Sequence, residues 1–258
     1  MRFASLGSGS EGNSLVVEAT SGTTTTRVLL DCGFSAKEVE RRLGRLNLCV
    51  DDLDAILITH EHSDHVGSAL TLARRASLPL YMSWGTARAV GADDADVELN
   101  VLWGDETARI GDLAVLPYTV PHDAREPLQF VFMDGRHRLG VLTDVGTSTP
   151  HINAVLSGCD ALVLESNHDT EMLATSRYPR SLKARIGGSH GHLSNDASAG
   201  ILASLERTRL QHLVAAHLSQ QNNTPELARQ ALASVLGTDG SDVIVASQDA
   251  GFDWLGLG

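Results

Sequence analysis

Short apolar runs alternate with amphipathic segments along the whole chain. Runs rich in Val, Ile and Leu at residues 13–19, 27–33 and 53–59 are typical of buried strands. Apolar residues at helical spacing follow at 35–46, behind a candidate N-cap, Ser35. The same patterns predict further strands at 79–83, 97–103, 113–120, 128–134, 138–144, 161–166, 212–217 and 242–247, and further helices at 63–76, 149–157, 195–208 and 224–236.

No linker, repeat or low-complexity block interrupts this alternation. The four threonines Thr23–Thr26 are interpreted as a hairpin turn, and Ser63 as the cap of the helix at 63–76. Strands and helices that alternate so regularly bury their apolar faces best in layers. The pattern therefore predicts one α/β domain over residues 1–258, with two sheets packed together and helices outside.

Composition and charge restrict the classes of function. No apolar run approaches about 18 residues, so no membrane span is expected. The first residues lack the apolar core of a secretory signal, and three widely spaced cysteines favour reduced thiols, so we expect a cytoplasmic protein. A net charge of −12 argues against binding nucleic acid over the whole surface. A phosphate-bearing substrate would be held locally, by metal ions or a confined basic patch.

Candidate metal ligands concentrate where the apolar run at 53–59 ends, in the stretch THEHSDH. His60 and His62 follow a strand, where residues two apart point the same way, so both imidazoles can bind one ion. Asp64 and His65 are displaced into the next helix and suit a second ion, since two-metal hydrolases hold their ions about 3.5–4 Å apart. A solvated loop with incidental histidines is the alternative, and the spacing disfavours it.

Three more candidate ligands follow predicted strands. His122 comes after the strand at 113–120, Asp144 ends the strand at 138–144, and His217 ends the strand at 212–217. Each alone is equally consistent with a cap or turn residue, but strand ends on one rim bring such side chains together. Asp144 is the natural bridging carboxylate, because it can offer one oxygen to each cation.

The order of these residues resembles the five motifs of the metallo-β-lactamase-fold hydrolases. Within that superfamily the chain most resembles the YycJ/WalJ-type branch, through SLGSGSEGNS, THEHSDHVG, HDAREPLQF, LVLESNHD and GHLSN. The resemblance covers essentially the whole chain and implies an αββα four-layer sandwich with the site on one edge. It also implies two ligand sets that share Asp144, with Asp31 fixing the metal loop from behind. The two sets are His60, His62 and His122 for one ion, and Asp64, His65 and His217 for the other.

Features between Asp144 and His217 separate the branches of the superfamily. The gap is too short for the large domain that the β-CASP nucleases insert there, and secreted β-lactamases usually carry another residue in place of Asp144. The gap instead resembles the tRNase Z-type sequence, in which a Gly-His loop precedes a helix, a strand and the last histidine. On that resemblance, Glu165 supports His192, which protonates the leaving oxygen or steadies the phosphate. The alternative is a loop histidine bonded to backbone.

The resemblance implies a dinuclear, metal-dependent phosphodiesterase. A water or hydroxide bridging two divalent cations would attack phosphorus, with Asp64 and Asp144 orienting it. The nitrogen and oxygen ligands suit Zn, Mn or Fe. The YycJ/WalJ-type branch implies a 5′-to-3′ exonuclease that acts on DNA rather than RNA, linked to repair. A glyoxalase II-like hydrolase of a small ester or thioester, or a non-catalytic metal-binding protein, is the alternative.

The densest basic patch near the site is predicted to contact the substrate backbone. It comprises Arg177, Arg180, Lys183 and Arg185, and a solvated helix face is an equally good interpretation. The other candidate substrate-binding residues are His168, Ser194 and Asn195. The Ser/Gly-rich segment at 5–14 is interpreted as a tight turn, with Asn13 as a possible donor to substrate. The sequence carries no signal for oligomeric state.

Overall fold

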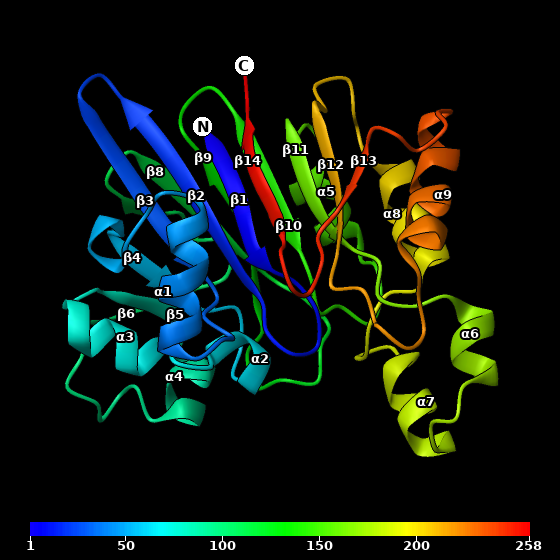
Figure 1. The fold of residues 1–258 in the computed structure, drawn as a ribbon, viewed down its shortest axis with the longest axis horizontal. Helices are drawn as coiled ribbons and strands as arrows, with labels where there is room; N and C mark the ends of the chain where they lie inside the picture. Colours follow the sequence, from blue (N-terminus) through cyan, green and yellow to red (C-terminus); the bar gives the residue numbers. More distant parts are fainter.

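Two seven-stranded sheets face each other in the computed structural model, which describes residues 1–258 (Figure 1). The first sheet has the order β14-β1-β2-β3-β4-β5-β6, with β1 (Arg2–Gly7), β2 (Ser14–Ser21), β3 (Thr24–Leu30), β4 (Ala55–Leu57), β5 (Leu80–Ser83), β6 (Leu99–Leu102) and β14 (Phe252–Gly256). The second has the order β13-β12-β11-β10-β9-β8-β7, with β7 (Ala108–Ile110), β8 (Leu113–Thr119), β9 (Leu128–Met133), β10 (Arg138–Leu142), β11 (Ala161–Glu165), β12 (His212–Ala216) and β13 (Val243–Val245).

Helices cover the two outer faces. The first sheet carries α1 (Ala36–Arg45), α3 (Ala69–Ala76) and α4 (Trp84–Val90), and the second carries α5 (Pro150–Leu156), α8 (Asn195–Ser204) and α9 (Pro225–Leu236). The short α2 (Ser63–Val66), α6 (Thr170–Thr175) and α7 (Arg180–Ile186) lie toward the lower edge of Figure 1. The expected αββα four-layer sandwich is confirmed, and none of its helices has the length and apolar character to cross a membrane.

Alternation of side chains along each strand builds three hydrophobic layers. In β9, Phe130 and Phe132 enter the layer between the sheets, while Val131 points to the helices of the second sheet. In β4, Leu57 enters the layer between the sheets, and Ile56 packs under the helices of the first sheet. Strands buried on both faces explain why the sequence shows continuous apolar runs there.

The structure corrects three local predictions. The predicted helix at 63–76 is broken into α2 and α3 at Gly67, whose φ is 32°, and a Cβ there would lie 2.3 Å from the Cys32 carbonyl oxygen. The residue that caps α2 is His62 rather than Ser63. The hairpin turn is formed by residues 22–23 alone, because Ser21 pairs with Thr24 and the following threonines belong to β3.

Several short elements were not predicted. They are β1, β7, β14, α4, α6 and α7. The N-terminal segment interpreted as a tight turn is partly strand, since β1 continues to Gly7 and β2 begins at Ser14. Only the residues between these strands form the turn.

Parallel strands decide where the site lies. β3, β4, β5 and β6 are parallel to one another, and so are β10, β11, β12 and β13. Their carboxyl ends therefore meet at one edge of the sandwich, which is where open α/β sheets form their sites. Asp31 follows β3, Asp144 follows β10 and His217 follows β12, so the sheets bring these residues to the same edge.

Candidate metal centre

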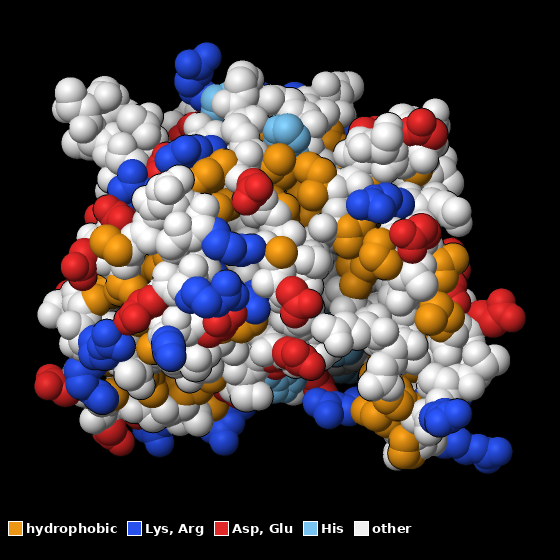
Figure 2. Space-filling view, in the orientation of Figure 1, with side chains coloured by type: hydrophobic (Ala, Val, Ile, Leu, Met, Phe, Trp, Pro, Cys, Tyr) orange, Lys and Arg blue, Asp and Glu red, His pale blue; other side chains and the backbone are white.

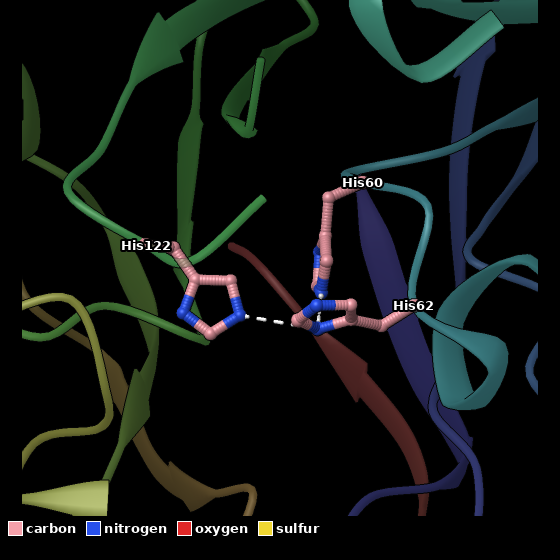
Figure 3. Close-up of side chains that lie close together, drawn as sticks. All are labelled: His60, His62 and His122. Atoms are coloured by element: carbon pink, nitrogen blue, oxygen red, sulfur yellow. Dashed lines mark hydrogen bonds between the residues drawn. The ribbon is translucent and has the colours of Figure 1, made fainter. Parts of the chain in front are cut away.

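Three histidines from two loops direct ring nitrogens at one point (Figure 3). The Nδ1 atom of His62 lies 3.0 Å from Nε2 of His60 and 3.3 Å from Nε2 of His122. His60 and His62 follow β4, and His122 follows β8. Ligand atoms of all three lie within 4.8 Å of one another, which is a spacing that one metal ion can span.

A second group lies beside the first. Nε2 of His65 and Nε2 of His217 lie 3.6 and 3.7 Å from Oδ2 of Asp64. Asp144 joins the two groups, because its Oδ2 lies 3.0 Å from Nε2 of His65 and its Oδ1 lies 4.0 Å from Nε2 of His122. The seven residues expected as ligands therefore converge on one cleft.

Backbone conformation orients three acidic or imidazole side chains at this edge of the sandwich. Asp31, Asp144 and His217 each have φ between 53° and 59°, in the left-handed region that non-glycine residues rarely adopt. Each follows directly after or close to the end of a strand. The left-handed turn directs Asp144 and His217 into the cleft, whereas Asp31 lies behind it, against Nδ1 of His65. Such a conformation costs of order 1–3 kcal/mol and persists only when surrounding contacts hold it. Strain of this kind is common at functional sites.

Hydrogen bonds fix which ring nitrogen faces the cleft. Oδ2 of Asp31 lies 2.7 Å from Nδ1 of His65, so the Nε2 atom of His65 points inward. The carbonyl oxygen of Gly191 lies 3.1 Å from Nδ1 of His122, with the same result. Metal-binding histidines are oriented in this way by a partner on the other nitrogen.

The residues fit divalent metal ions. Nε2 of His217 and Oδ2 of Asp144 are buried and make no hydrogen bond, although Oδ2 lies 3.0 Å from Nε2 of His65. A buried polar atom without a partner costs free energy, and a cation between these atoms would satisfy both. Imidazole nitrogen together with carboxylate oxygen suits Zn, Mn or Fe.

Charges within the cleft balance one another. Burial alone would raise the pKa of Asp144, but the imidazoles of His217 and His65 hold it well below its ordinary value. Burial alone would lower the pKa of His217, but the carboxylates of Asp144, Asp64 and Glu165 raise it to about 10. Metal ions bind the deprotonated imidazole, so binding at these nitrogens releases protons.

A carboxylate–imidazole pair forms part of the cleft wall. Oε1 of the fully buried Glu165 lies 2.8 Å from Nδ1 of His192 and 3.2 Å from Nδ1 of His217. Its Oε2 accepts hydrogen bonds from the backbone N–H groups of Val145 and Leu193. Burial opposes ionisation, but the charge and hydrogen bonds of His192 and His217 lower the pKa of Glu165 to about 2. Glu165 therefore stays charged and holds both rings.

Comparisons with known proteins identify the family of the chain. A family model described as "Beta-lactamase superfamily domain" matches residues 26–218. Exodeoxyribonuclease YycJ of Bacillus anthracis is 38% identical to this chain, over 94% of this chain and 92% of the relative. Exodeoxyribonuclease WalJ of Streptococcus pneumoniae is 34% identical, over 91% of this chain and 88% of the relative. The chain belongs to the YycJ/WalJ family of the β-lactamase superfamily.

Other members of the superfamily are more distant. Ribonuclease Z of Methanopyrus kandleri is 38% identical over 38% of this chain and 37% of the relative. Zn(2+)-bound PqqB of Methylobacterium extorquens has a TM-score of 0.75 at 20% identity, over all of both chains. The metallo-β-lactamase fold protein YhfI of Bacillus subtilis has a TM-score of 0.74 at 16% identity, over 99% of both chains. At these identities the solved structures establish the fold of the family and no more.

Four of the seven predicted substrate-binding residues line two cavities. The metal cleft has a volume of about 410 Å³ and is lined by Arg185 and His192 together with four of the expected ligands, His62, Asp64, Asp144 and His217. His168, Lys183 and Ser194 line a neighbouring cavity. Arg177, Arg180 and Asn195 line neither. Arg177 and Arg180 are exposed, and the side chain of Asn195 is buried and paired with Asn223.

Sequence reasoning missed Asp123. Its Oδ2 accepts a hydrogen bond from Nε of Arg185 at 2.6 Å, and its Oδ1 lies 3.4 Å from Nε2 of His122. The sequence signal that could have identified Asp123 is its position directly after His122, an expected ligand, in HDAREPLQF. Asn13, expected as a donor to substrate, instead places Nδ2 at 3.1 Å from Nε2 of His65. It therefore contacts the metal-ligand group itself.

Asp31→Asn tests whether Asp31 orients His65, a member of the second group of expected ligands. The substitution keeps the shape but removes the charge that faces Nδ1 of His65, so we expect metal affinity to fall about 10–100-fold. Competition with a fluorescent chelator for Zn²⁺ measures this affinity. Asp54→Asn, at an exposed aspartate before β4, is the control and should bind metal normally. Equal affinity in both variants would show that Asp31 does not orient His65.

Proposed function

We propose that this protein is a metal-dependent exodeoxyribonuclease that degrades a DNA strand from 5′ to 3′. The observation that carries the proposal is the contact of 2.8 Å between Oε1 of Glu165 and Nδ1 of His192 on the wall of the metal cleft. The 3′-oxygen of a nucleotide is a poor leaving group unless it is protonated, and a carboxylate-supported imidazole is a suited donor. The names of the YycJ and WalJ relatives support the same conclusion.

We propose two divalent ions per chain, either Zn, Mn or Fe. One ion would be held by His60, His62 and His122, the other by Asp64, His65 and His217, and each would receive one oxygen of Asp144. When bound, such ions lower the pKa of water toward neutrality and offset the negative charge of the phosphate.

Side chains of the chain itself would perform the remaining tasks. Since Glu165 occupies Nδ1 of His192, the Nε2 atom is the one available to protonate the leaving oxygen. The carboxylates of Asp64 and Asp144 would accept hydrogen bonds from the attacking water and so orient it. The guanidinium of Arg185, which also lines the cleft, would bind a non-bridging phosphate oxygen.

DNA is the proposed polymer because of how much of the chain its relatives match. The exodeoxyribonuclease relatives match at least 91% of the chain, whereas the ribonuclease Z relative matches 38% of it. A net charge of −12 disfavours long non-specific contact with either polymer, so the few cations near the cleft must hold the strand. Histidine side chains appear in the hollow at the lower edge of Figure 2, and Lys or Arg side chains gather near α7 at the lower right.

Metal-loaded protein should be assayed against end-labelled DNA, end-labelled RNA, a bis-nitrophenyl phosphodiester and a thioester. A 5′-to-3′ exodeoxyribonuclease releases a 5′ label as a mononucleotide at once and converts 3′-labelled DNA into a ladder. Faster digestion of RNA would reject DNA as the preferred polymer, and a ladder from 5′-labelled DNA would reject the polarity. Turnover of the thioester without turnover of DNA would reject the nuclease.

Arg185→Gln tests the phosphate contact. The ion pair with Asp123 is largely exposed, so the fold should survive its loss. We expect KM for DNA to rise about tenfold, because one charge-assisted hydrogen bond is lost, and the salt dependence of KM to weaken. The small diester should be affected much less. Arg74→Gln, an exposed arginine in α3, is the control, and equal effects on both substrates would reject a backbone contact.

A further inference from the structure

One wall of the metal cleft is apolar. The hydrophobic residues that line the cleft are Tyr178, Leu182 and Ile186, which follow one another at intervals of four. Residues four apart lie on the same face of a helix, so Leu182 and Ile186 of α7 face the cleft together. Tyr178 comes just before Pro179, the cap of α7, and extends this face. We refer to these three residues as the α7 wall.

The α7 wall is not part of the hydrophobic core. Its three side chains belong to none of the hydrophobic layers of the sandwich, and each is only half-buried. α7 has no buried residue at all. An amphipathic helix normally covers its apolar face by packing against the protein. Because the apolar face of α7 borders the cleft instead, a ligand in the cleft would cover it.

The remainder of the cleft lining is polar and charged. It includes the expected metal ligands together with Asp123. Two contacts hold α7 beside these residues. Nε of Arg185 donates a hydrogen bond to Oδ2 of Asp123 at 2.6 Å, and the carbonyl oxygen of Ile186 accepts one from the N–H of His192 at 2.8 Å. In Figure 1, α7 lies to the right of α2, which carries Asp64. The cleft therefore combines a charged region with an apolar wall in a fixed arrangement.

A nucleotide has both of these chemistries. Its phosphate is an anion that suits cations and imidazoles, whereas its base is a flat ring with two apolar faces. Bases stack on aromatic side chains, and the stacking tolerates every sequence because each base has such a face. An aromatic ring followed by two aliphatic side chains is a surface on which one base can lie.

We propose that the α7 wall binds the base of the nucleotide that is being removed, with Tyr178 stacked on that base. This inference rests on the proposed nuclease function and adds how the departing nucleotide is held. In the hydrolysis, the bond from the water oxygen to phosphorus forms, the bond from phosphorus to O3′ breaks, and His192 passes a proton to O3′. The sugar of the departing nucleotide therefore lies at His192.

The order of residues along α7 places the base. Ile186 lies next to His192, since the two share a backbone hydrogen bond. Leu182 lies one helical turn away, about 6 Å along the axis, and Tyr178 lies farther in the same direction. A base attached to a sugar at His192 would therefore extend along the wall toward Tyr178. The wall offers no pattern of donors and acceptors, so we expect it to accept all four bases and to disfavour an end that has no base.

Tyr178→Ser tests the wall by removing the aromatic ring. Tyr178 lies outside the core, so the fold should be retained, and Tyr178→Phe is the matched variant that keeps the ring. The substrates are a natural strand and the same strand with a tetrahydrofuran abasic nucleotide at its 5′ end. For wild type and Tyr178→Phe we expect kcat/KM of the first cut to be about tenfold higher for the natural strand. For Tyr178→Ser the ratio should approach one.

Two further variants and one further substrate sharpen the test. Leu182→Asn, which makes the wall polar at similar size, should also lower the ratio. Trp103→Ser removes a ring that is 55% exposed and does not line the cleft, so it should leave the ratio unchanged. A strand whose second nucleotide is abasic should be cut nearly as fast as the natural strand. A loss confined to that strand would mean that the wall holds the retained strand, which overturns the inference.

Binding separates this inference from the nuclease proposal. The fluorescence of 2-aminopurine at the 5′ end of a strand with phosphorothioate linkages reports stacking on the metal-loaded protein without turnover. If the wild type shortens no strand but quenches this fluorescence, and Tyr178→Ser does not quench it, the nuclease proposal fails and the base site stands. Equal quenching by both proteins overturns the inference. It is also overturned if light scattering shows that Tyr178→Ser dissociates an oligomer while the ratio of rates is unchanged, because the wall would then bind a second copy of the chain.

Discussion

Asp144→Asn is expected to lower the rate of phosphodiester hydrolysis by about 10³-fold or more and to reduce the amount of bound metal. Asp144 is the one carboxylate that faces both ligand groups, at 3.0 Å from Nε2 of His65 and 4.0 Å from Nε2 of His122. Asparagine preserves the shape but removes a charge that both ions would use, and each contributes several kcal/mol to transition-state stabilisation. Metal per chain from elemental mass spectrometry, together with turnover of the bis-nitrophenyl phosphodiester, measures the effect.

Asp160→Asn provides a matched control. Asp160 is also a buried aspartate, but it precedes β11 at the opposite edge of the sheet and pairs with Arg209 at 3.0 Å. Its substitution should lower the free energy of unfolding. The metal content and the rate of phosphodiester hydrolysis of the folded protein should not change. If Asp144→Asn retains the metal content and activity of the wild type, Asp144 does not bridge the two groups and the two-ion proposal fails.

The sequence was sufficient to predict where the ligands lie. A buried parallel strand is a continuous apolar run, so its end is visible as the first polar residue after the run. His217 is such a residue, and Asp144 comes one residue later, after Thr143. Because parallel strands share an edge, their convergence follows from topology alone. The histidines after β4 were visible for the same reason. Residue type and period therefore predicted two sheets with helices outside and candidate ligands at the ends of strands, and the family resemblance implied the four-layer sandwich with its site at one edge.

The exact ends of helices and short strands could not be predicted from the sequence in the same way. The apolar spacing of a helix continues across Gly67, so the periodicity does not indicate a division between α2 and α3. The break depends on how closely Gly67 approaches the backbone of Cys32, which only the folded chain determines. Likewise, Ser63 has the residue type of a cap, but the backbone turns one residue earlier, at His62. Short edge strands such as β7 have too few residues to show a period.

Contacts between distant segments were the hardest to foresee. Arg185 and Asp123 are 62 residues apart, and each alone is an ordinary surface residue in the sequence. His168 is a candidate substrate-binding residue in the sequence, but nothing there indicates that the fold buries it beside the N-terminus of α8 without a partner for Nδ1. Such sites depend on how loops pack against the folded sheets and helices. The periodicity of apolar residues in the sequence contains no information about that packing.

His192→Gln is expected to reduce DNA cleavage by about 10²–10⁴-fold, the usual contribution of a general acid, while metal content stays at the wild-type level. The reduction should be much smaller for the bis-nitrophenyl phosphodiester, because nitrophenolate leaves without a proton. The ratio of the two rates is therefore the decisive measurement. His151→Gln, at a half-buried histidine outside the cleft that pairs with Asp105, is the control. Equal losses on both substrates would reject a role in protonation, and loss of metal would make His192 a ligand.

Glu165→Gln separates support of His192 from support of His217, because Oε1 of Glu165 contacts both rings. If Glu165 acts only through His192, adding Glu165→Gln to His192→Gln should cost little further activity on DNA. If it also orients His217, the double variant should lose metal affinity that His192→Gln alone retains. Substitutions at residues in direct contact are expected to be non-additive. The sign of the interaction energy between the two substitutions, in DNA cleavage and in metal affinity, identifies which ring the carboxylate supports. We expect both effects, with the larger one in the DNA cleavage rate, since the contact with His192 is the shorter one.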